Sequence, residues 1–278
     1  MSNNSNQHAV PVALTIAGSD SSGGAGIQAD LKTFSALQVY GASVITSVTA
    51  QNTLGISAIH PIPGDIVSAQ LRAVLQDLNV KAIKIGMLGG ASTVDAVADV
   101  LEEYCSHSGV IDPVMLSKSG NALLDPDALA LVKKRLLPLS NVFTPNLPEA
   151  VALTGCSEPS SLIEMYQILE PLHELGVPWV LLKGGHLPAE EQAIDLLSDG
   201  KQVFELRANR FATKNTHGTG CTLSSAVAAG LAKGMSVEQS VRDAKKYITV
   251  AIAAADALQI GAGHGPLHHF SLLWSQKG

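Results

Sequence analysis

The segment Asn215–Ala226 carries the residues of this chain that are best suited to chemistry. It reads Asn-Thr-His-Gly-Thr-Gly-Cys-Thr-Leu-Ser-Ser-Ala and runs into an apolar, alanine-rich stretch that predicts a helix. At a helix start several backbone N–H groups lack an intrahelical partner, and the helix dipole favours negative charge there. Gly218 and Gly220 allow a ligand to come close to those groups. The segment is therefore a candidate cradle for a phosphoryl group.

Cys221 falls in the first turn of that predicted helix. A thiol in this position is biased toward the thiolate and can act as a base or a nucleophile. The simpler interpretation is a glycine-rich turn that caps a helix, with Cys221 as a small core residue. Short motifs often arise by chance, so the segment alone does not decide between the two interpretations.

A second group of polar residues follows predicted strands in the middle of the chain. Asn146 and Glu149 stand three residues apart, so that their oxygens can hold Mg²⁺ or its water shell. The same spacing is typical of a helix-capping box, and both interpretations can hold together. Asp112 ends another strand and lies either near the metal or in a turn. Lys183 ends an apolar strand and needs a partner, for which a nucleotide phosphate is a natural choice.

The glycine-rich loop near the N-terminus admits a different reading. The spacing Gly24-x-Gly26-x-x-Ala29 fits a relaxed dinucleotide-binding fingerprint. However, these glycines come several residues after the preceding strand, and the next strand ends at Gln51 and Asn52 without an acidic residue for a ribose. Nicotinamide binding is therefore disfavoured. The absence of a Gly-x-x-x-x-Gly-Lys-Ser/Thr sequence excludes a Walker-type ATP site.

The composition narrows the class of protein further. The chain has 278 residues, of which 46% are hydrophobic and 15% charged. A chain of this length and composition can bury one large hydrophobic core. The net charge of −6 and the scattered Lys and Arg residues argue against nucleic-acid binding, and no apolar run is long enough to span a membrane. Residues 1–12 predict a disordered polar tail without a signal-peptide layout. With three cysteines and no export signal, we expect a cytoplasmic protein.

The elements that must position these residues alternate between strand and helix. The predicted strands are 12–17, 42–50, 56–62, 81–86, 110–114, 141–144 and 179–183, with a hairpin over 194–197 and 202–206. The predicted helices are 25–37, 63–78, 91–104, 125–137, 160–175, 221–233 and 237–258. This alternation predicts a single α/β domain over residues 13–278, with a mostly parallel sheet covered on both faces. Ligands bind at the carboxyl ends of such strands, where most of the candidate residues fall, and this favours an enzyme.

Taken as an ordered set, these segments closely resemble the hydroxymethylpyrimidine/phosphomethylpyrimidine kinases of thiamin biosynthesis, in the ribokinase-like superfamily. The resemblance rests on Ala17–Asp30, Ala50–Thr53, Lys84–Met87, Asp112–Met115, Lys118–Gly120, Thr144–Ala150, Lys183–His186 and Asn215–Thr222. It implies a three-layer α/β/α sandwich with a central, mostly parallel sheet, commonly assembled as a homodimer. It also implies ATP and Mg²⁺, with phosphorylation of 4-amino-5-hydroxymethyl-2-methylpyrimidine and then of its monophosphate in one pocket.

The same resemblance implies roles for individual residues. The anion hole would be Gly218, Thr219, Gly220 and Cys221, with Cys221 as the general base where sugar kinases of the superfamily have Asp. The ATP side would use Lys183, Asn146 and Thr216, and Mg²⁺ would be served by Glu149 and Asp112. Gln51 would read the pyrimidine, and the ring would be surrounded by Gly18, Asp20, Met87 and Val114.

Two alternatives stay open beside this assignment. Pyridoxal kinase shares the architecture, but the carboxamide of Gln51 matches the adjacent ring nitrogen and amino group of an aminopyrimidine, a pair that pyridoxal lacks. A catalytically inactive, ligand-binding regulator would also keep the fold, although Lys183, Glu149 and Cys221 argue against it. The C-terminal His264, His268 and His269 have no defined metal-site spacing, and we interpret them as part of a structural loop.

Overall fold

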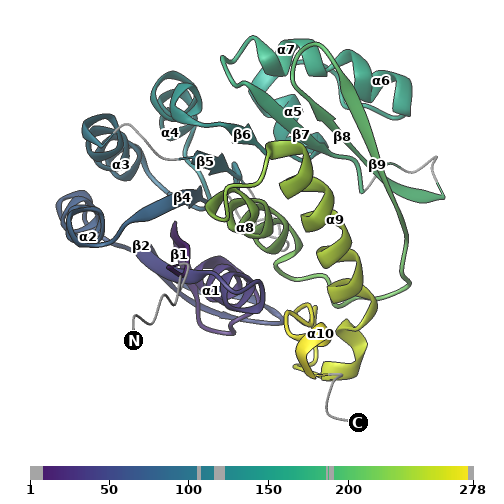
Figure 1. Cartoon of the computed structure of the whole chain (residues 1–278), viewed down its shortest axis with the longest axis horizontal. Coiled ribbons are helices and arrows are strands. Elements are labelled where there is room, and N and C mark those ends of the chain that lie inside the picture. The colour runs from purple at the N-terminus through teal and green to yellow at the C-terminus, as the bar shows by residue number, and fades with distance from the viewer. Residues whose placement is uncertain (1–8, 105–107, 116–122, 186, 188–190, 275–278) are drawn as a thin grey trace, which may run out of the picture.

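A nine-stranded sheet runs through the computed structural model, which describes residues 9–104, 108–115, 123–185, 187 and 191–274 (Figure 1). The strands are β1 Val12–Asp20, β2 Tyr40–Asn52, β3 Gly55–Pro61, β4 Val80–Ile85, β5 Ser108–Ile111, β6 Val142–Phe143, β7 Trp179–Lys183, β8 Gln192–Ser198 and β9 Val203–Asn209. Their order across the sheet is β3-β2-β1-β4-β5-β6-β7-β8-β9. The strands from β2 to β7 are parallel, and β3, β8 and β9 join antiparallel at the two ends.

Helices cover both faces of this sheet (Figure 1). One core cluster is formed with α2 Gly64–Asp77, α3 Ala91–Glu103, α4 Pro126–Leu131, α5 Leu147–Thr154, α6 Leu162–Gln167 and α7 Leu169–His173. The other is formed with α1 Gly26–Ala36, α8 Thr219–Ala232 and α9 Val237–Ala253. Successive strand residues point to opposite faces, so Ile83 and Ile85 of β4 join the first cluster while Ala82 joins the second. The predicted three-layer α/β/α sandwich is confirmed.

Three predicted helices differ from the observed ones, and proline explains two of the differences. The helix expected over 160–175 is divided at Ile168, because Pro171 has no N–H group to continue the hydrogen-bond ladder. The helix expected over 125–137 ends at Leu131 and continues as a π-helical turn and a 3₁₀ turn that contains Pro138. The last predicted helix ends at Ala253 and is followed by the 3₁₀ turn Ala255–Leu258.

Two features lie near the limits of the described residues. Of the predicted tail 1–12, residues 1–8 lie outside the described part, and β1 begins at Val12. A short helix, α10 Ser271–Trp274, follows α9 near the C-terminus. Within the described residues, no helix has the length and apolar character needed to cross a membrane.

The strand order places a topological switch point between β1 and β4. The chain runs from β1 to β2 on one side of β1 and returns to β4 on its other side. Ligands bind at such a switch point, outside the carboxyl ends of the strands. Gly18 belongs to the last part of β1, and Met87 follows β4. The fold therefore brings two residues of the predicted substrate site to this switch point.

Candidate active site

The N-terminus of α8 forms the predicted cradle. Gly218 caps this helix with a φ of 80°, a conformation that side chains with a Cβ rarely adopt, and a Cβ here would collide with the carbonyl oxygen of Gly24. A Cβ on Gly220 would lie 3.2 Å from Asp112 Oδ2 and 3.5 Å from Lys183 Nζ. The N-terminus of α8 therefore lies between the glycine loop on one side and the Asp112–Lys183 pair on the other.

Cys221 lies in the first turn of α8, as predicted, but the expected bias toward the thiolate is wrong. Burial raises the pKa of the Cys221 thiol to about 11. The ammonium of Lys84 lowers this pKa, while the carboxylates of Asp30 and Asp112 raise it. Removal of the thiol from water outweighs the helix dipole, because a charged sulfur loses its hydration in the interior. In the free protein the group is a neutral thiol at neutral pH.

A buried ion pair between Lys84 of β4 and Asp30 of α1 lies near this thiol. Lys84 Nζ is 2.9 Å from Asp30 Oδ2, and both side chains are fully buried. Asp30 also accepts hydrogen bonds from Thr15 Oγ1 and Ser225 Oγ, each at 2.6 Å. Burial alone would lower the pKa of Lys84, but Asp30 raises it above its usual value. Sequence reasoning missed this pair, although a lysine inside an apolar strand was a signal that it needed an acidic partner.

A second ion pair joins Lys183, at the end of β7, to Asp112, just after β5. Lys183 Nζ lies 2.7 Å from Asp112 Oδ1 and 3.9 Å from Glu149 Oε2. Asp112 also accepts from Thr144 Oγ1 and from Ser224 Oγ of α8, both at 3.3 Å. Burial would raise the pKa of Asp112, but the ammonium groups of Lys183 and Lys84 hold it below its usual range. The structure therefore brings Lys183, Asp112 and Glu149 together, as the sequence predicted.

Asn146 and Glu149 form the capping box at the start of α5. Asn146 Oδ1 accepts from the backbone N–H of Glu149, and Glu149 Oε2 accepts from the backbone N–H of Asn146, both at 2.8 Å. Burial raises the pKa of Glu149 to about 7, with Lys183 acting against the shift and Asp112 adding to it. The capping interpretation is confirmed, and the same box holds a carboxyl group beside Asp112.

These carboxyl groups fit a weakly held Mg²⁺. Two carboxyl groups share one lysine, since Lys183 Nζ lies 2.7 Å from Asp112 Oδ1 and 3.9 Å from Glu149 Oε2. No group of three or more His, Cys, Asp or Glu residues that could enclose a metal occurs in the described parts of the chain. Phosphate-bound Mg²⁺ usually keeps several waters and takes one or two carboxylates, which is what Asp112 and Glu149 offer.

The opposite side of α8 carries a polar network around His217. His217 Nε2 lies 2.8 Å from Asp20 Oδ2 and 3.2 Å from the side-chain nitrogen of Gln51. Asp20 also accepts from the backbone N–H groups of Ser22, Gly24 and Ala25, so it organises the glycine loop. Burial would raise the pKa of Asp20, but the hydrogen bonds from His217 and Ser22 lower it. Sequence reasoning assigned no role to His217, which links Gln51 to the cradle.

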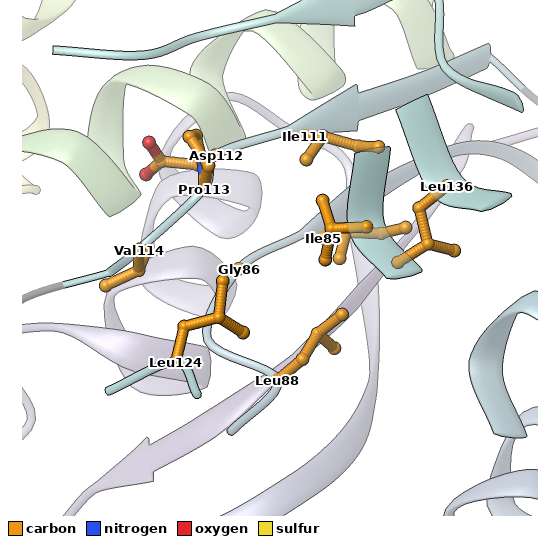
Figure 2. Close-up of a pocket in the computed structure, with 10 residues that line it drawn as sticks. Ile85, Gly86, Leu88, Ile111, Asp112, Pro113, Val114, Leu124 and Leu136 are labelled. Atoms are coloured by element: carbon orange, nitrogen blue, oxygen red, sulfur yellow. The ribbon is translucent and has the colours of Figure 1, made fainter. Parts of the chain in front are cut away.

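The remaining predicted ring contacts lie at the ends of β1, β4 and β5. A Cβ on Gly18 would lie 2.9 Å from Met87 Cε, so these two residues are in contact. Val114 lines a small, mostly apolar pocket with Gly86 and Leu124 (Figure 2). In Figure 2 the carboxylate of Asp112 points away from Ile85, Ile111 and Leu136 of that pocket. Asp112 therefore presents its charge toward α8 and Lys183 rather than toward the apolar lining.

Thr216 and the C-terminal histidines are the remaining residues that the sequence analysis named. Thr216 lies in the turn before α8, where its carbonyl oxygen accepts from Thr219 Oγ1 at 2.7 Å. His269 hydrogen-bonds Thr222 Oγ1 at 3.0 Å, and burial lowers its pKa to about 4. His268 packs edge-on against Trp274, and His264 bonds the carbonyl oxygen of Lys214. These contacts support the structural interpretation of the histidines. Lys118–Gly120 and His186 lie outside the described residues.

Comparison with known proteins agrees with this geometry. A family model described as phosphomethylpyrimidine kinase matches residues 20–268. The chain belongs to this family. It is 54% identical to a hydroxymethylpyrimidine/phosphomethylpyrimidine kinase of Rhizobium meliloti, over 95% of this chain and 98% of that protein. It is 49% identical to the enzyme of the same name from Escherichia coli, over 94% and 98% of the two chains.

Solved structures of two kinds of vitamin kinase are similar to this family member. An ADP complex of Bacillus subtilis pyridoxal kinase matches with a TM-score of 0.88 and 39% identity, over 95% of this chain and 99% of that one. Phosphomethylpyrimidine kinase of Clostridium difficile matches with a TM-score of 0.77 and 43% identity, over 87% and 99%. Pyridoxal kinase of Staphylococcus aureus in complex with AMP-PCP and pyridoxal matches with a TM-score of 0.87 and 34% identity, over 95% of each chain.

Proposed function

We propose that this chain transfers a phosphoryl group from ATP to the 5-hydroxymethyl group of 4-amino-5-hydroxymethyl-2-methylpyrimidine, and then phosphorylates the monophosphate, in thiamin biosynthesis. The observation that carries the proposal is the position of the α8 N-terminus between two polar groups. Gln51 and His217 lie on one side of it, and Lys183 and Asp112 on the other. The names of the relatives support the same reaction.

The ATP side is assigned to the residues around Lys183. Lys183 neutralises phosphate charge, and Asn146 and Thr216 flank the nucleotide. Asp112 and Glu149 would hold Mg²⁺, which would offset the charge of the phosphate oxygens. The 2.7 Å contact between Lys183 and Asp112 supports this assignment, because it keeps the ammonium next to the cradle before any nucleotide binds.

The cradle itself acts on the transferring group. The N–H groups at the start of α8, from Gly218 to Cys221, donate to the phosphoryl oxygens, where the helix dipole also favours negative charge. The thiolate form of Cys221, a minor species at neutral pH, accepts the proton of the attacking hydroxyl group and becomes the neutral thiol. A thiol with a pKa of about 11 is scarcely ionised, but a loose, dissociative transition state requires little proton removal before the phosphoryl group has moved. Positioning and electrostatic stabilisation thus supply most of the catalysis.

Gln51 is assigned to substrate selection. Its amide oxygen lies 3.2 Å from Thr49 Oγ1, and its amide nitrogen lies 3.2 Å from His217 Nε2. A fixed amide presents one donor and one acceptor, which match the ring nitrogen and the adjacent amino group of an aminopyrimidine. A site built for such a pair discriminates well, because another ligand leaves buried polar groups without partners.

Phosphorylation of pyridoxal is the second candidate activity, favoured by the similarity to the pyridoxal kinases of Bacillus subtilis and Staphylococcus aureus. The experiment is a competition between hydroxymethylpyrimidine and pyridoxal at equal concentration, with ATP and Mg²⁺ and products resolved by mass. We expect the pyrimidine to react faster and to yield mono- and diphosphate. Gln51→Leu should reduce this preference, and Cys221→Ala should lower turnover about a hundredfold or more while the fold is kept. Preference for pyridoxal by the wild type contradicts the assignment.

A homodimer in the cytoplasm is proposed for the working enzyme. The edge hairpin of β2 and β3 exposes the apolar side chains of Val48, Leu54 and Ile59, which supports a self-association surface there. Cys156 and Cys221 are free thiols, which supports a reducing compartment. Light scattering of the purified protein tests the dimer directly, and a monomer at micromolar concentration would contradict it.

A further inference from the structure

One buried hydroxyl group beside the predicted ring site has no hydrogen-bond partner. Among the buried side-chain nitrogen and oxygen atoms of the described residues, this holds for Ser47 Oγ alone. Ser47 lies on β2 and is 3% exposed. The neighbouring threonines of the strand are satisfied, since Thr46 donates to the carbonyl oxygen of Met87 and Thr49 to that of Ser19. Buried polar groups are almost always paired, so an unpaired one needs an explanation.

The surroundings of this hydroxyl place it at the switch point. The register between β1 and β2 shifts between Ala17 and Ser19, so Gly18 stands at an irregularity opposite Ser47. A Cβ on Gly18 would lie 2.8 Å from Ser47 Oγ and 2.9 Å from Met87 Cε. Bulges of this kind often lie next to active sites and redirect a side chain. Ser47, Gly18 and Met87 therefore meet where β1 and β4 end.

The hydroxyl also continues a row of polar residues. Ser47, Thr49 and Gln51 alternate along β2, so they share one face of the sheet. Thr49 Oγ1 lies 3.2 Å from Gln51 Oε1 and ties the outer two members of the row together. Ser47 stands at the inner end and lacks such a partner. The row leads from Gln51, at the cradle, toward the contact between Gly18 and Met87.

We infer that Ser47 is a substrate-specificity residue, whose hydroxyl group hydrogen-bonds a nitrogen on the edge of the heteroaromatic ring of the substrate. The inference rests on the proposed function and extends its ring site beyond Gln51. Met87 Cε lies against the same point of Gly18 as the hydroxyl, and a methionine side chain is flexible enough to move aside when a ring enters. A hydroxyl group both donates and accepts, so it suits a ring nitrogen or an amino group.

The test compares Ser47→Ala with the wild type in calorimetric binding of hydroxymethylpyrimidine and in steady-state kinetics. We expect the dissociation constant and KM for the pyrimidine to rise about tenfold, the loss that one hydrogen bond typically produces. KM for ATP should not change. The melting temperature should stay the same or rise, because the variant removes an unpaired buried group. Ser57→Ala on β3, whose exposed hydroxyl donates to Ala50, is the matched control and should change none of these values.

The outcomes separate this inference from the proposed function. If the wild type binds the pyrimidine and Ser47→Ala binds it within twofold, the inference is overturned and the proposed function stands. If the wild type binds pyridoxal and not the pyrimidine, the proposed function fails, and Ser47→Ala is then measured with pyridoxal. A tenfold loss there would support a ring contact by Ser47, and no loss would overturn it. A lower melting temperature with unchanged binding would assign Ser47 a structural role and overturn the inference.

Discussion

Two lysine–aspartate pairs lie beside the first turns of α8, where Ser225 contacts one and Ser224 the other, and they differ in how completely they are hydrogen-bonded. Lys84 and Asp30 are fully buried, and Asp30 also accepts hydrogen bonds from the hydroxyl groups of Thr15 and Ser225. In the second pair Asp112 is also buried, but the Lys183 side chain is 15% exposed. A second carboxyl group, that of Glu149, lies 3.9 Å from the same ammonium. The first pair is balanced in charge. The second has two acids for one base.

This difference distinguishes a pair that stabilises the fold from a pair that is suited to bind a cation and a phosphate group. A balanced, fully hydrogen-bonded pair gains nothing from a ligand, and breaking it leaves an uncompensated charge in the core. An excess of carboxyl groups at a partly open place attracts a cation, and its lysine is available to an incoming phosphate. Both pairs look alike in the sequence, as a lysine in or at the end of an apolar strand. Three comparisons of variants test the distinction.

The largest contrast is expected between Lys84→Met and Lys183→Met. Lys84→Met should lower the free energy of unfolding by about 3–5 kcal/mol in urea, because it leaves Asp30 buried and unpaired. Lys183→Met should cost about 1–2 kcal/mol, since Glu149 can take up a proton instead, but it should lower kcat/KM for ATP about a hundredfold. The double variant Lys84→Met with Asp30→Asn should recover much of the lost stability. Equal losses from the two lysine variants would contradict the distinction.

Two adjacent serines of α8 provide a smaller, matched contrast. Ser225 Oγ donates to Asp30 at 2.6 Å, while Ser224 Oγ lies 3.3 Å from Asp112 and also donates to the carbonyl oxygen of Gly220 at 2.9 Å. Ser225→Ala should cost about 1.5–3 kcal/mol of unfolding free energy, as expected for a hydrogen bond to a buried charge. Ser224→Ala should cost less than about 1 kcal/mol. Urea denaturation of both variants measures this, and the reverse order would remove the distinction between the pairs.

The smallest effect concerns the pH dependence of stability at Glu149. The pKa of this group is raised from 4.5 to about 7 in the folded protein, so the unfolded chain loses its proton first as the pH rises. Between these pH values the native state binds more protons, and its stability falls as the pH increases. Glu149→Gln, which keeps a capping-box acceptor, removes this loss. We expect it to be more stable than the wild type by on the order of 1 kcal/mol at pH 8.

The control for that prediction is the same measurement near pH 5. There the folded wild type still carries the proton on Glu149, and the advantage of Glu149→Gln should be much smaller than at pH 8. A difference that stays constant from pH 5 to pH 8 would mean that the carboxyl group does not titrate in this range. The raised pKa that burial gives Glu149 in the folded protein would then be wrong.

Sequence patterns were sufficient to predict features that depend on residues close together in the chain. The capping box of Asn146 and Glu149 depends on residues three apart, and the cradle depends on glycines placed directly before a helix. The break between α6 and α7 was not predicted, although Pro171 stands inside the predicted helix and was a local signal for it. In each case the backbone hydrogen bonds involved join residues that are close in the chain, so their geometry follows from spacing alone.

Tertiary structure alone decided the properties that depend on burial and on distant partners. Asp30, Lys84 and Ser225 come from α1, β4 and α8, and no spacing reveals that they share one cluster. The thiolate expected at Cys221 was wrong for the same reason, since packing removes water from the sulfur and outweighs the helix end. The sequence determined the order of elements, the helix starts and the residue types available for chemistry. Which charges are hidden, which are paired and which hydroxyl is left without a partner depends on contacts across the sheet, because desolvation is a property of the assembled core.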